Sequence, residues 1–246
     1  MKIKYFAPSY KRPEKSSTQK MYPEVTLVVS EDEAEEYKKN GNVVITCPNE
    51  IQGNLCRVRN WIIDEHIKDY DCIVLMDDDN SGVFRWENQE FIKLRGEEFY
   101  EEVEKCTILC KDYGYYFWGM NCMPDKGAYM EHTPFGTTRY IGGPFQCIMN
   151  GNELRYDETL PLKEDYDYTL QNLLKYGGAL RFNYLSYRNK QSMQPGGCSA
   201  QRNTDREREQ FDLLQKKWGS DIIQVDSKSK KDFDYNPIMK TPLRGV

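Results

Sequence analysis

The first eighty residues alternate between short apolar runs and amphipathic stretches. Apolar runs bounded by turn residues are typical of strands, and they occur at 3–8, 24–30, 42–48 and 71–76. Residues 31–41 place acids first and lysines last before Gly41, which suits a helix dipole. Residues 54–70 carry apolar side chains at helical spacing. Strands that alternate with helices predict an α/β fold with a mostly parallel sheet.

The remaining pattern predicts three more helices and three more strands. The helices are expected at 97–111, 163–178 and 204–218, and the strands within 113–122, 139–151 and 179–190. Residues 192–199, which contain Pro-Gly-Gly, are expected to form a flexible loop. The sequence contains no internal repeat and no low-complexity linker, so we expect no boundary between independent domains.

Composition and charge narrow the possible functions. The 246 residues are 39% hydrophobic and 30% charged, as in globular proteins. A net charge of −5 argues against a general nucleic-acid binder. However, residues 180–246 hold 13 Lys and Arg against 8 Asp and Glu. This local excess is compatible with a polyanionic acceptor, or with a mixed-charge helix exposed to solvent.

The cysteines and histidines give no sign of a metal or nucleophile site. Eight scattered cysteines lack CxxC spacing, so we expect free thiols and a reducing compartment, with Cys106 and Cys110 as packing residues. His66 is expected to be solvated, and His132 to lie in a loop on the acceptor side. With no long apolar run and no leader-like N-terminus, the expected protein is soluble, cytoplasmic and independent of membranes.

The sharpest candidate for chemistry is VLMDDDN, in which Asp77, Asp78 and Asp79 follow an apolar strand directly. Side chains alternate along an extended chain, so Asp77 and Asp79 can point the same way. Two such carboxylates repel each other unless a cation lies between them. Mg²⁺ or Mn²⁺, held by carboxylates and substrate phosphates, fits this arrangement. The alternative is a solvated acidic turn.

A second acidic pair, Glu164 and Asp165, begins the predicted helix at 163–178. The helix dipole alone favours acids at this position. The functional interpretation is a general base that takes a proton from an acceptor hydroxyl.

Several cations are expected near the ends of the parallel strands: Lys11, Arg12, Arg57, Arg59, Arg188 and Lys190. Arg57 and Arg59 lie two positions apart on a helix, so they point in different directions and one of them can reach a ligand phosphate. Arg188 and Lys190 precede the Pro-Gly-Gly loop, which could close over a diphosphate or be a plain surface loop.

Taken together, these stretches resemble the GT-A glycosyltransferases. PSYKRP resembles their first nucleotide-contacting loop, and GNLCRVRN resembles their Gly-x-x-x-Arg-x-x-Asn segment. LMDDDN resembles their Asp-x-Asp (DXD) motif, and KEDYDYTLQNLLKYGG their Glu-Asp helix. The resemblance covers residues 3–178. It implies one GT-A-like, Rossmann-like domain over 1–246, with 1–80 as the nucleotide-sugar-binding half and 81–246 as the acceptor-binding half and C-terminal tail.

Within that class the chain is most similar to the phage branch of TET-associated DNA glycosyltransferases. The similar parts are APSYKRP, the run into MDDDN, and a C-terminal region with Pro-Gly-Gly and a Lys/Trp helix. Members of this branch are associated with glycosylation of hydroxymethylated pyrimidines in DNA. The resemblance therefore implies a bacteriophage hexosyltransferase, acting in the host cytoplasm, with a UDP-sugar donor, Mn²⁺ or Mg²⁺, and DNA containing 5-hydroxymethylcytosine as a possible acceptor.

The resemblance also implies roles for matching residues. The expected metal ligands are Asp77 and Asp79, the expected catalytic pair is Asp165 with Glu164, and the expected donor-binding residues are Pro8, Tyr10, Arg12, Arg57, Asp77, Asp78 and Lys190. The chain lacks the Gln-x-x-Arg-Trp motif and a clear C-terminal His ligand of many inverting members. This leaves the loop role of Arg188 and Lys190 open.

Three alternatives remain. A sugar-nucleotide nucleotidyltransferase would also use paired carboxylates, but it usually needs a Gly-rich loop after the first strand, and APSYKRPEK has no glycine. A glycosyltransferase with a protein or small-molecule acceptor would share every motif. A non-catalytic binding module would not need both acidic motifs intact.

Overall fold

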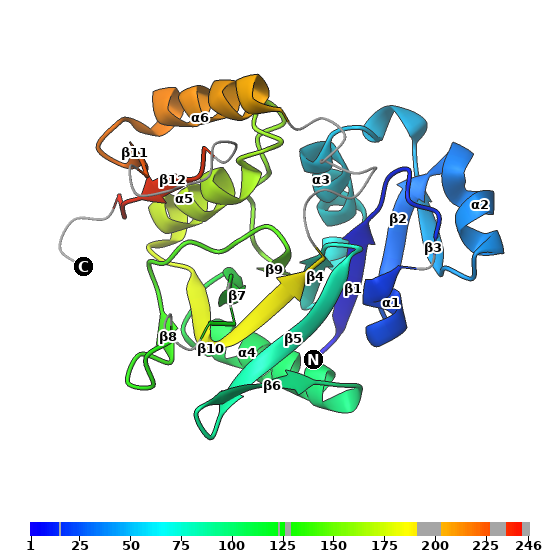
Figure 1. Cartoon of the computed structure of the whole chain (residues 1–246), viewed down its shortest axis with the longest axis horizontal. Coiled ribbons are helices and arrows are strands. Elements are labelled where there is room, and N and C mark those ends of the chain that lie inside the picture. The colour runs from blue at the N-terminus through cyan, green and yellow to red at the C-terminus, as the bar shows by residue number, and fades with distance from the viewer. Residues whose placement is uncertain (15, 123, 126–128, 191–202, 227–234, 243–246) are drawn as a thin grey trace.

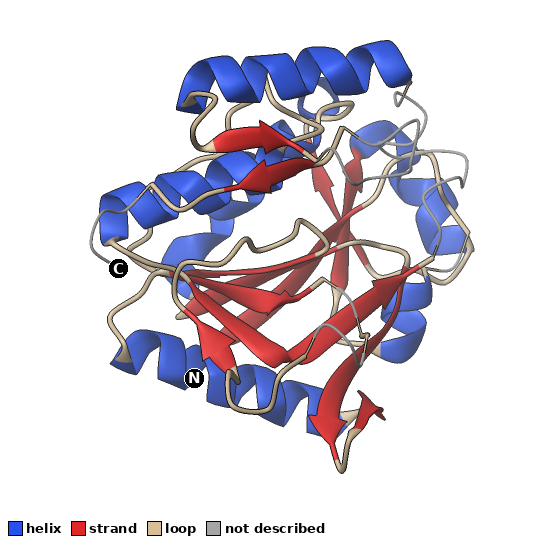
Figure 2. Cartoon of the chain, turned by 60° about the vertical axis from the view of Figure 1, so that its left-hand side comes forward, coloured by secondary structure: helices blue, strands red, loops and turns tan. Residues whose placement is uncertain are grey.

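The residues that the structure describes form a ten-stranded sheet with helices on both faces (Figures 1 and 2). The computed structural model describes residues 1–14, 16–122, 124–125, 129–190, 203–226 and 235–242. The order of the hydrogen-bonded strands is β3-β2-β1-β4-β9-β7-β10-β5-β6, with β8 paired to β10. The α/β class predicted from the sequence is confirmed.

The N-terminal part is the parallel α/β unit that the sequence predicts. Its strands are β1 (Ile3–Pro8), β2 (Thr26–Ser30), β3 (Val44–Cys47) and β4 (Cys72–Met76). All of the pairings among them are parallel. The helices that connect them are α1 (Ser17–Met21), the 3₁₀ turn η1 (Glu31–Glu33), α2 (Ala34–Lys39), η2 (Asn49–Ile51), α3 (Leu55–His66) and η3 (Ile67–Asp69).

The second part extends the sheet with strands of both directions. These strands are β5 (Asn80–Glu87), β6 (Glu90–Leu94), β7 (Phe117–Asn121), β8 (Phe135–Gly136), β9 (Phe145–Met149) and β10 (Leu180–Asn189). Its helices are α4 (Glu97–Asp112), α5 (Glu164–Tyr176) and α6 (Thr204–Trp218), followed by the small ribbon β11 (Ile223–Val225) and β12 (Pro237–Met239). The pairings make β5, β8 and β9 run opposite to the other seven described strands of the large sheet.

Alternation along the buried strands divides the core into two layers. On β4, Val74 faces the layer beneath α4, whereas Ile73 and Leu75 face the layer of α3 and α5. Both sets are fully buried. A strand that is buried on both faces carries apolar side chains at successive positions. Strand β4 could be predicted from the sequence because it has this pattern.

Helix α1, the β5–β6 hairpin and the short strands β8, β11 and β12 were not predicted. Helix α1 has five residues, too few for an apolar period to be visible. The β5–β6 hairpin turns at Asn88 and Gln89, whose φ angles of 50° and 64° suit a tight type I′ turn. Such turns favour Asn-Gly, so Asn-Gln gives only a weak hairpin signal.

His66 is only partly exposed, which differs from the prediction of a solvated side chain. Its ring stacks on Phe6 with centroids 4.8 Å apart and makes a T-shaped contact with Trp61. Burial lowers the pKa of His66. Cys106 and Cys110 are buried free thiols, as expected. Among the described residues, no helix combines the length and apolarity that a membrane crossing requires.

A buried ion pair joins helix α6 to the start of α5. Lys163 donates to Glu207 at 2.6 Å, and their side chains are only 1% and 3% exposed. Gln210 of α6 also accepts from the amide of Leu162 and donates to the carbonyl of Thr159. The segment that leads into the Glu164–Asp165 pair is therefore held from outside the sheet by α6.

Glu207→Gln is expected to lower the free energy of unfolding by about 3–5 kcal/mol, because it leaves the Lys163 ammonium buried without its charge partner. Glu153→Gln is a matched control, since Glu153 pairs with Lys175 at 2.6 Å but the two side chains are 76% and 39% exposed. The control is expected to have a much smaller effect, because an exposed ion pair contributes little to stability. Urea unfolding measures the free energy of unfolding of both variants. An equally small decrease in the two would contradict a stabilising role for the buried ion pair.

Candidate functional site

A cavity of about 360 Å³ opens at the carboxyl ends of β1 and β4. In the strand order, β1 leads to β2 and β3 on one side, and the chain crosses to β4 on the other. Ligands of open α/β sheets bind at such a switch point. The cavity is lined by the segment after β1, the start of α3, the acidic triplet after β4, the start of α5 and the end of β10.

Short hydrogen bonds hold the backbone of the acidic triplet in place. The hydroxyl of Thr18 donates to the carbonyl of Asp77 and the hydroxyl of Ser16 to the carbonyl of Asp78, both at 2.6 Å. The amide of Asn80 in turn donates to the Thr18 hydroxyl at 2.9 Å. Helix α1 thus fixes the turn that presents the three carboxylates.

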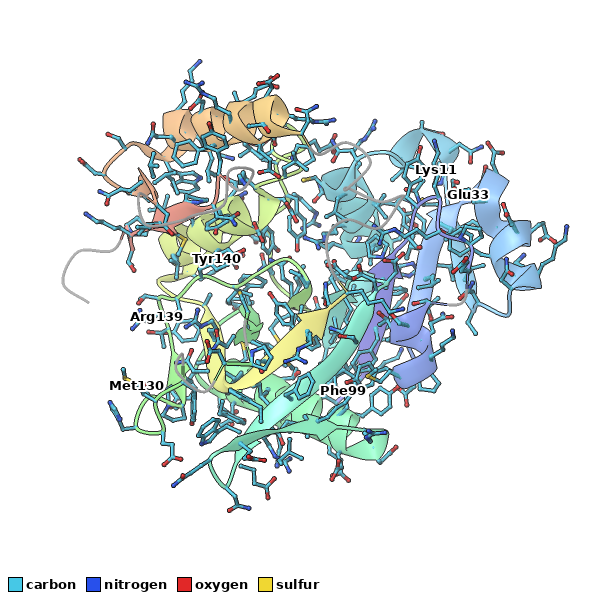
Figure 3. The ribbon with its side chains drawn as sticks, in the orientation of Figure 1. Lys11, Glu33, Phe99, Met130, Arg139 and Tyr140 are labelled. Carbon is cyan, nitrogen blue, oxygen red and sulfur yellow. The ribbon has the colours of Figure 1, made fainter. Side chains whose placement is uncertain are left out.

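Asp78 belongs to a network with the segment after β1. Its carboxylate accepts from the hydroxyl of Ser9 and from Arg12 Nη1, the latter at 3.1 Å. The phenol of Tyr37 bonds Ser9 at 2.9 Å and accepts the Arg12 amide at 3.0 Å. Nearby, the amide of Lys11 donates to Glu33, which joins this segment to η1, directly before α2 (Figure 3). Burial raises the pKa of Asp78, although Ser9 and Arg12 oppose this shift.

Asp77 and Asp79 both line the cavity, and their negative charges repel each other. Burial and then the charges of Asp77 and Asp78 raise the pKa of Asp79 to about 7. Burial also raises the pKa of Asp77. Asp77 accepts a hydrogen bond from Asn189 at 2.6 Å. Within the described part of the chain, Oδ1 of Asp79 is buried without a hydrogen-bond partner.

Arg59 is the central cation of the site. It is 1% exposed, and its guanidinium donates to Gly143 O at 2.8 Å, Glu164 Oε1 at 3.1 Å and Gln146 Oε1 at 3.2 Å. Its Nη2 also lies 3.8 Å from Asp77 Oδ1. One side chain of α3 therefore joins the end of β4, the turn before β9 and the start of α5.

The two carboxylates of α5 have different surroundings. Burial and then the charge of Asp165 raise the pKa of Glu164, while Arg59 opposes this shift. Asp165 Oδ2 accepts from the phenol of Tyr140 at 2.5 Å and from the amide of Gly143 at 3.0 Å. The ring of Tyr140 stacks on Tyr166 of α5, with centroids 4.2 Å apart.

Gly143 permits the convergence of these groups. A Cβ atom at this position would lie 3.0 Å from Glu164 Oε1 and 3.5 Å from Arg59 Nη1. A side chain would therefore press on the carboxylate of Glu164, which would have to shift by a few tenths of an ångström, whereas its contact with the guanidinium would be an ordinary one. The close approach of the carboxylate, and not a left-handed backbone, favours glycine at this position.

The structure brings most of the predicted site residues together. The predicted residues that line the cavity are Pro8, Tyr10, Arg12, Asp77, Asp78, Asp79, Glu164, Asp165 and Lys190. Arg57 is not among the lining residues, because its Nη2 donates to the carbonyl of Gln52 at 3.3 Å. Arg188 and the exposed His132 do not line the cavity either. Residues 192–199, predicted as a flexible loop, lie outside the described residues.

Several residues of the site were not singled out from the sequence. They are Ser9, Ser16, Thr18, Tyr37, Asn80, Tyr140, Gly143, Gln146 and Asn189. The sequence places Arg59 near Arg57 on one helix, but only Arg57 is predicted as a donor-binding residue. A signal for Arg59 exists, since it shares the helical face of Leu55, Ile62 and Ile63, and a cation on an apolar face needs a buried partner. The other residues of the site give no such signal, because their roles depend on contacts with residues that are distant in the sequence.

Side chains that could hold a metal are few. Among the described residues, no group of three or more His, Cys, Asp or Glu side chains is placed to hold one ion. A pair of carboxylates that shares a cation with substrate phosphates does not need a third protein ligand of these types. Asp77 and Asp79 are the candidates for that pair.

Comparison with protein families gives one match over most of the chain. The family model described as TET-Associated Glycosyltransferase matches residues 3–198. No curated protein sequence matches the chain.

Solved structures with a similar course of the chain include A197 from STIV and residues 1–349 of TarS from S. aureus. A197 is 14% identical with a TM-score of 0.42, and the match covers 78% of this chain and 86% of A197. TarS is 15% identical with a TM-score of 0.46, and the match covers 78% of this chain and 61% of the TarS fragment. Neither likeness identifies a substrate.

Asp79→Asn is expected to stabilise the metal-free protein by a few kcal/mol at pH 8 but not near pH 4. The native state keeps the proton of Asp79 up to about pH 7, whereas the unfolded chain releases it near pH 4. The free energy of unfolding therefore falls as pH rises through this interval, and the variant lacks that loss. Urea unfolding in the presence of a chelator measures the difference.

Asp212→Asn on the exposed surface of α6 is the matched control, because it removes the same charge away from the cavity. The control is expected to show no comparable gain at pH 8. A gain for Asp79→Asn that is the same at pH 4 and pH 8 would show that the charge of Asp79 is not the cause.

Proposed function

The chain belongs to the TET-associated glycosyltransferase family, and on this premise we propose that it transfers a hexosyl group from a UDP-sugar to the hydroxyl of a 5-hydroxymethylpyrimidine in DNA. Glycosyl transfer follows from the family. The donor nucleotide, the need for a divalent cation and the acceptor are the proposed parts.

The charge balance of the cavity is the observation that carries the proposal. Its lining includes five carboxylates, from Asp77, Asp78, Asp79, Glu164 and Asp165, against three cations, from Arg12, Arg59 and Lys190. When all five carboxyl groups are ionised, this excess of two negative charges would repel an anionic diphosphate. A divalent cation offsets the excess, and carboxylates are ligands that Mn²⁺ or Mg²⁺ prefers.

Asp77 and Asp79 are proposed to hold this cation. The unpartnered Oδ1 of Asp79, among the described atoms, and the mutual repulsion of the two acids fit a ligand pair that is stable only with a cation between them. When bound, the cation supplies Lewis-acid neutralisation of the leaving diphosphate. Asn189 orients Asp77 through its hydrogen bond at 2.6 Å.

The donor is proposed to lie across the ends of β1 and β4. Pro8, Tyr10 and Arg12 would surround the nucleoside, and Asp78 would reach the ribose. Lys190 would contact the diphosphate from the end of β10. Arg57, which bonds the Gln52 carbonyl, would act by shaping the loop beside the nucleoside.

Asp165 is proposed to accept the proton of the acceptor hydroxyl. Its donors, Tyr140 and the amide of Gly143, fix its direction, and a positioned carboxylate is a suitable general base. Glu164 would hold Arg59 in place through their contact at 3.1 Å.

DNA is proposed as the acceptor for two reasons. The branch to which the chain is similar is associated with modified DNA, and residues 180–246 carry an excess of basic side chains. A cavity at the end of a sheet cannot admit a base that is still stacked in a duplex, so the target nucleotide must be extruded or unpaired.

The first test is release of nucleoside diphosphate from a panel of UDP-sugars with Mn²⁺. It compares no acceptor, unmodified DNA, and DNA that contains 5-hydroxymethylcytosine. We expect release that depends on both metal and modified DNA. Equal release with every acceptor would contradict the DNA assignment, and release of pyrophosphate would favour a nucleotidyltransferase.

Two substitutions separate the proposed roles. Asp79→Ala is expected to abolish transfer and to weaken UDP binding in the presence of Mn²⁺. Asp165→Asn is expected to lower kcat by at least about 100-fold, the scale of a positioned general base, with little change in UDP affinity. Kinetics and calorimetric titration measure both quantities, and unchanged transfer would remove either residue from the mechanism.

A further inference from the structure

One face of the sheet outside the cavity combines aromatic rings with cations. By the pairing of β5 with β6 and β10, Phe84 lies opposite Lys93, Trp86 opposite Phe91, and Gly82 opposite Arg188. Side chains at these positions share one face because strands alternate. We call the set Phe84, Trp86, Phe91, Lys93 and Arg188 the aromatic-basic face. Its β5–β6 hairpin forms the lower margin of the molecule in Figures 1 and 2.

The cations of this face have no acidic partners among the described residues. Neither Arg188 nor Lys93 forms an ion pair with a carboxylate of that part of the chain, and neither does the adjacent Arg95. Lys93 donates instead to the carbonyl of Ser81 at 2.6 Å. Burial and then the charges of Arg95 and Arg188 lower the pKa of Lys93. Three like charges held together cost free energy that an anion would remove.

The rings of the face contact one another and a cation, and each keeps some exposure to solvent. Arg188 lies over the ring of Phe84, with its guanidinium carbon 5.5 Å from the centroid. Trp86 packs with Phe91 at 5.1 Å and with Tyr129 at 5.0 Å. All four rings are only partly buried. Phe84 and Trp86 are two positions apart on one strand, so their rings are spaced by roughly 7 Å.

The aromatic-basic face is continuous with the cavity. Arg188 is followed by Asn189, which donates to Asp77 at 2.6 Å, and then by Lys190, which lines the cavity. The end of β10 therefore carries one cation on the face and another at the cavity.

We propose that the aromatic-basic face binds a single-stranded segment of DNA that flanks the nucleotide held in the cavity. Arg188, Lys93 and Arg95 contact the phosphates, and Phe84 and Trp86 stack on unpaired bases. This inference rests on the proposed function, because extrusion of a target pyrimidine leaves its neighbours without partners. Stacking on these rings requires bases, so the rings favour DNA over a polyanion that has none.

The test is the binding of a fluorescein-labelled DNA strand of about 12 nucleotides, without donor, between roughly 50 and 200 mM NaCl. The double variant K93Q/R188Q is expected to bind more weakly, and the slope of log affinity against log salt is expected to become shallower by about 0.7 for each phosphate that the variant no longer neutralises. Lys111→Gln, on the exposed surface of α4, removes a cation elsewhere and is expected to behave as wild type. Equal affinity and slope for the double variant and wild type would overturn the proposal, as would no binding by wild type.

A second variant tests the rings. Phe84→Leu is expected to weaken binding of the DNA strand at least about fivefold, the low end of the effect of removing one base–ring stack. It is expected to leave the binding of inorganic polyphosphate unchanged. Equal weakening for both probes would show that the face binds phosphate alone, and would overturn the assignment of DNA.

Calorimetric titration of UDP in the presence of Mn²⁺ and without DNA separates this proposal from the proposed function. None of the substituted residues lines the cavity, so the UDP affinity of these variants is expected to equal that of wild type. Unaltered UDP binding with unaltered strand binding in the variants overturns the assignment of the face alone. Absence of UDP binding by wild type, together with strand binding that depends on Phe84 and Arg188, overturns the donor site and leaves the face.

Discussion

The buried guanidinium of Arg59 is the interaction on which the site depends. A charge removed from water is tolerated only when it is paired and hydrogen-bonded, and the partners of Arg59 come from separate elements. Gly143 O comes from the turn before β9, Glu164 from α5, and Asp77 from the end of β4. The requirement to satisfy one cation therefore brings three distant parts of the chain to the same point.

The free energy for this convergence comes from the layers on either side of the sheet. The alternating side chains of β1 and β4 fill both core layers, so the strand ends are fixed without any contribution from the acids that follow them. The acids can then be placed where they repel one another. Burial that raises the pKa values of Asp77, Asp78 and Asp79 is a cost of the free protein, and it prepares the site for a cationic ligand.

The sequence was most informative where local order decides the structure. The parallel strands, α3, α4, α5 and α6 follow from apolar periods and capping residues, and the acidic triplet is conspicuous because it ends a buried strand. The choice between Arg57 and Arg59 depends on which side of α3 packs against the sheet, and that is a tertiary fact. The tethers from Ser16 and Thr18 to the triplet span about sixty residues of chain, so no local pattern could reveal them. The turn of the β5–β6 hairpin has an unusual composition, so the hairpin could not be predicted from the sequence. The aromatic-basic face could not be predicted either, because it depends on the pairing of these strands.

The ion pair of Lys163 and Glu207 has a consequence for the evolution of related sequences. Glu207 lies beyond residues 3–198, the part that matches the family model, yet its carboxylate neutralises the residue directly before Glu164. A relative that replaces one member of the pair would keep a buried charge unless it replaced the other as well. The two positions should therefore be inherited as a unit, and an exchange of C-terminal segments between relatives would succeed only where residue 163 is exchanged with them.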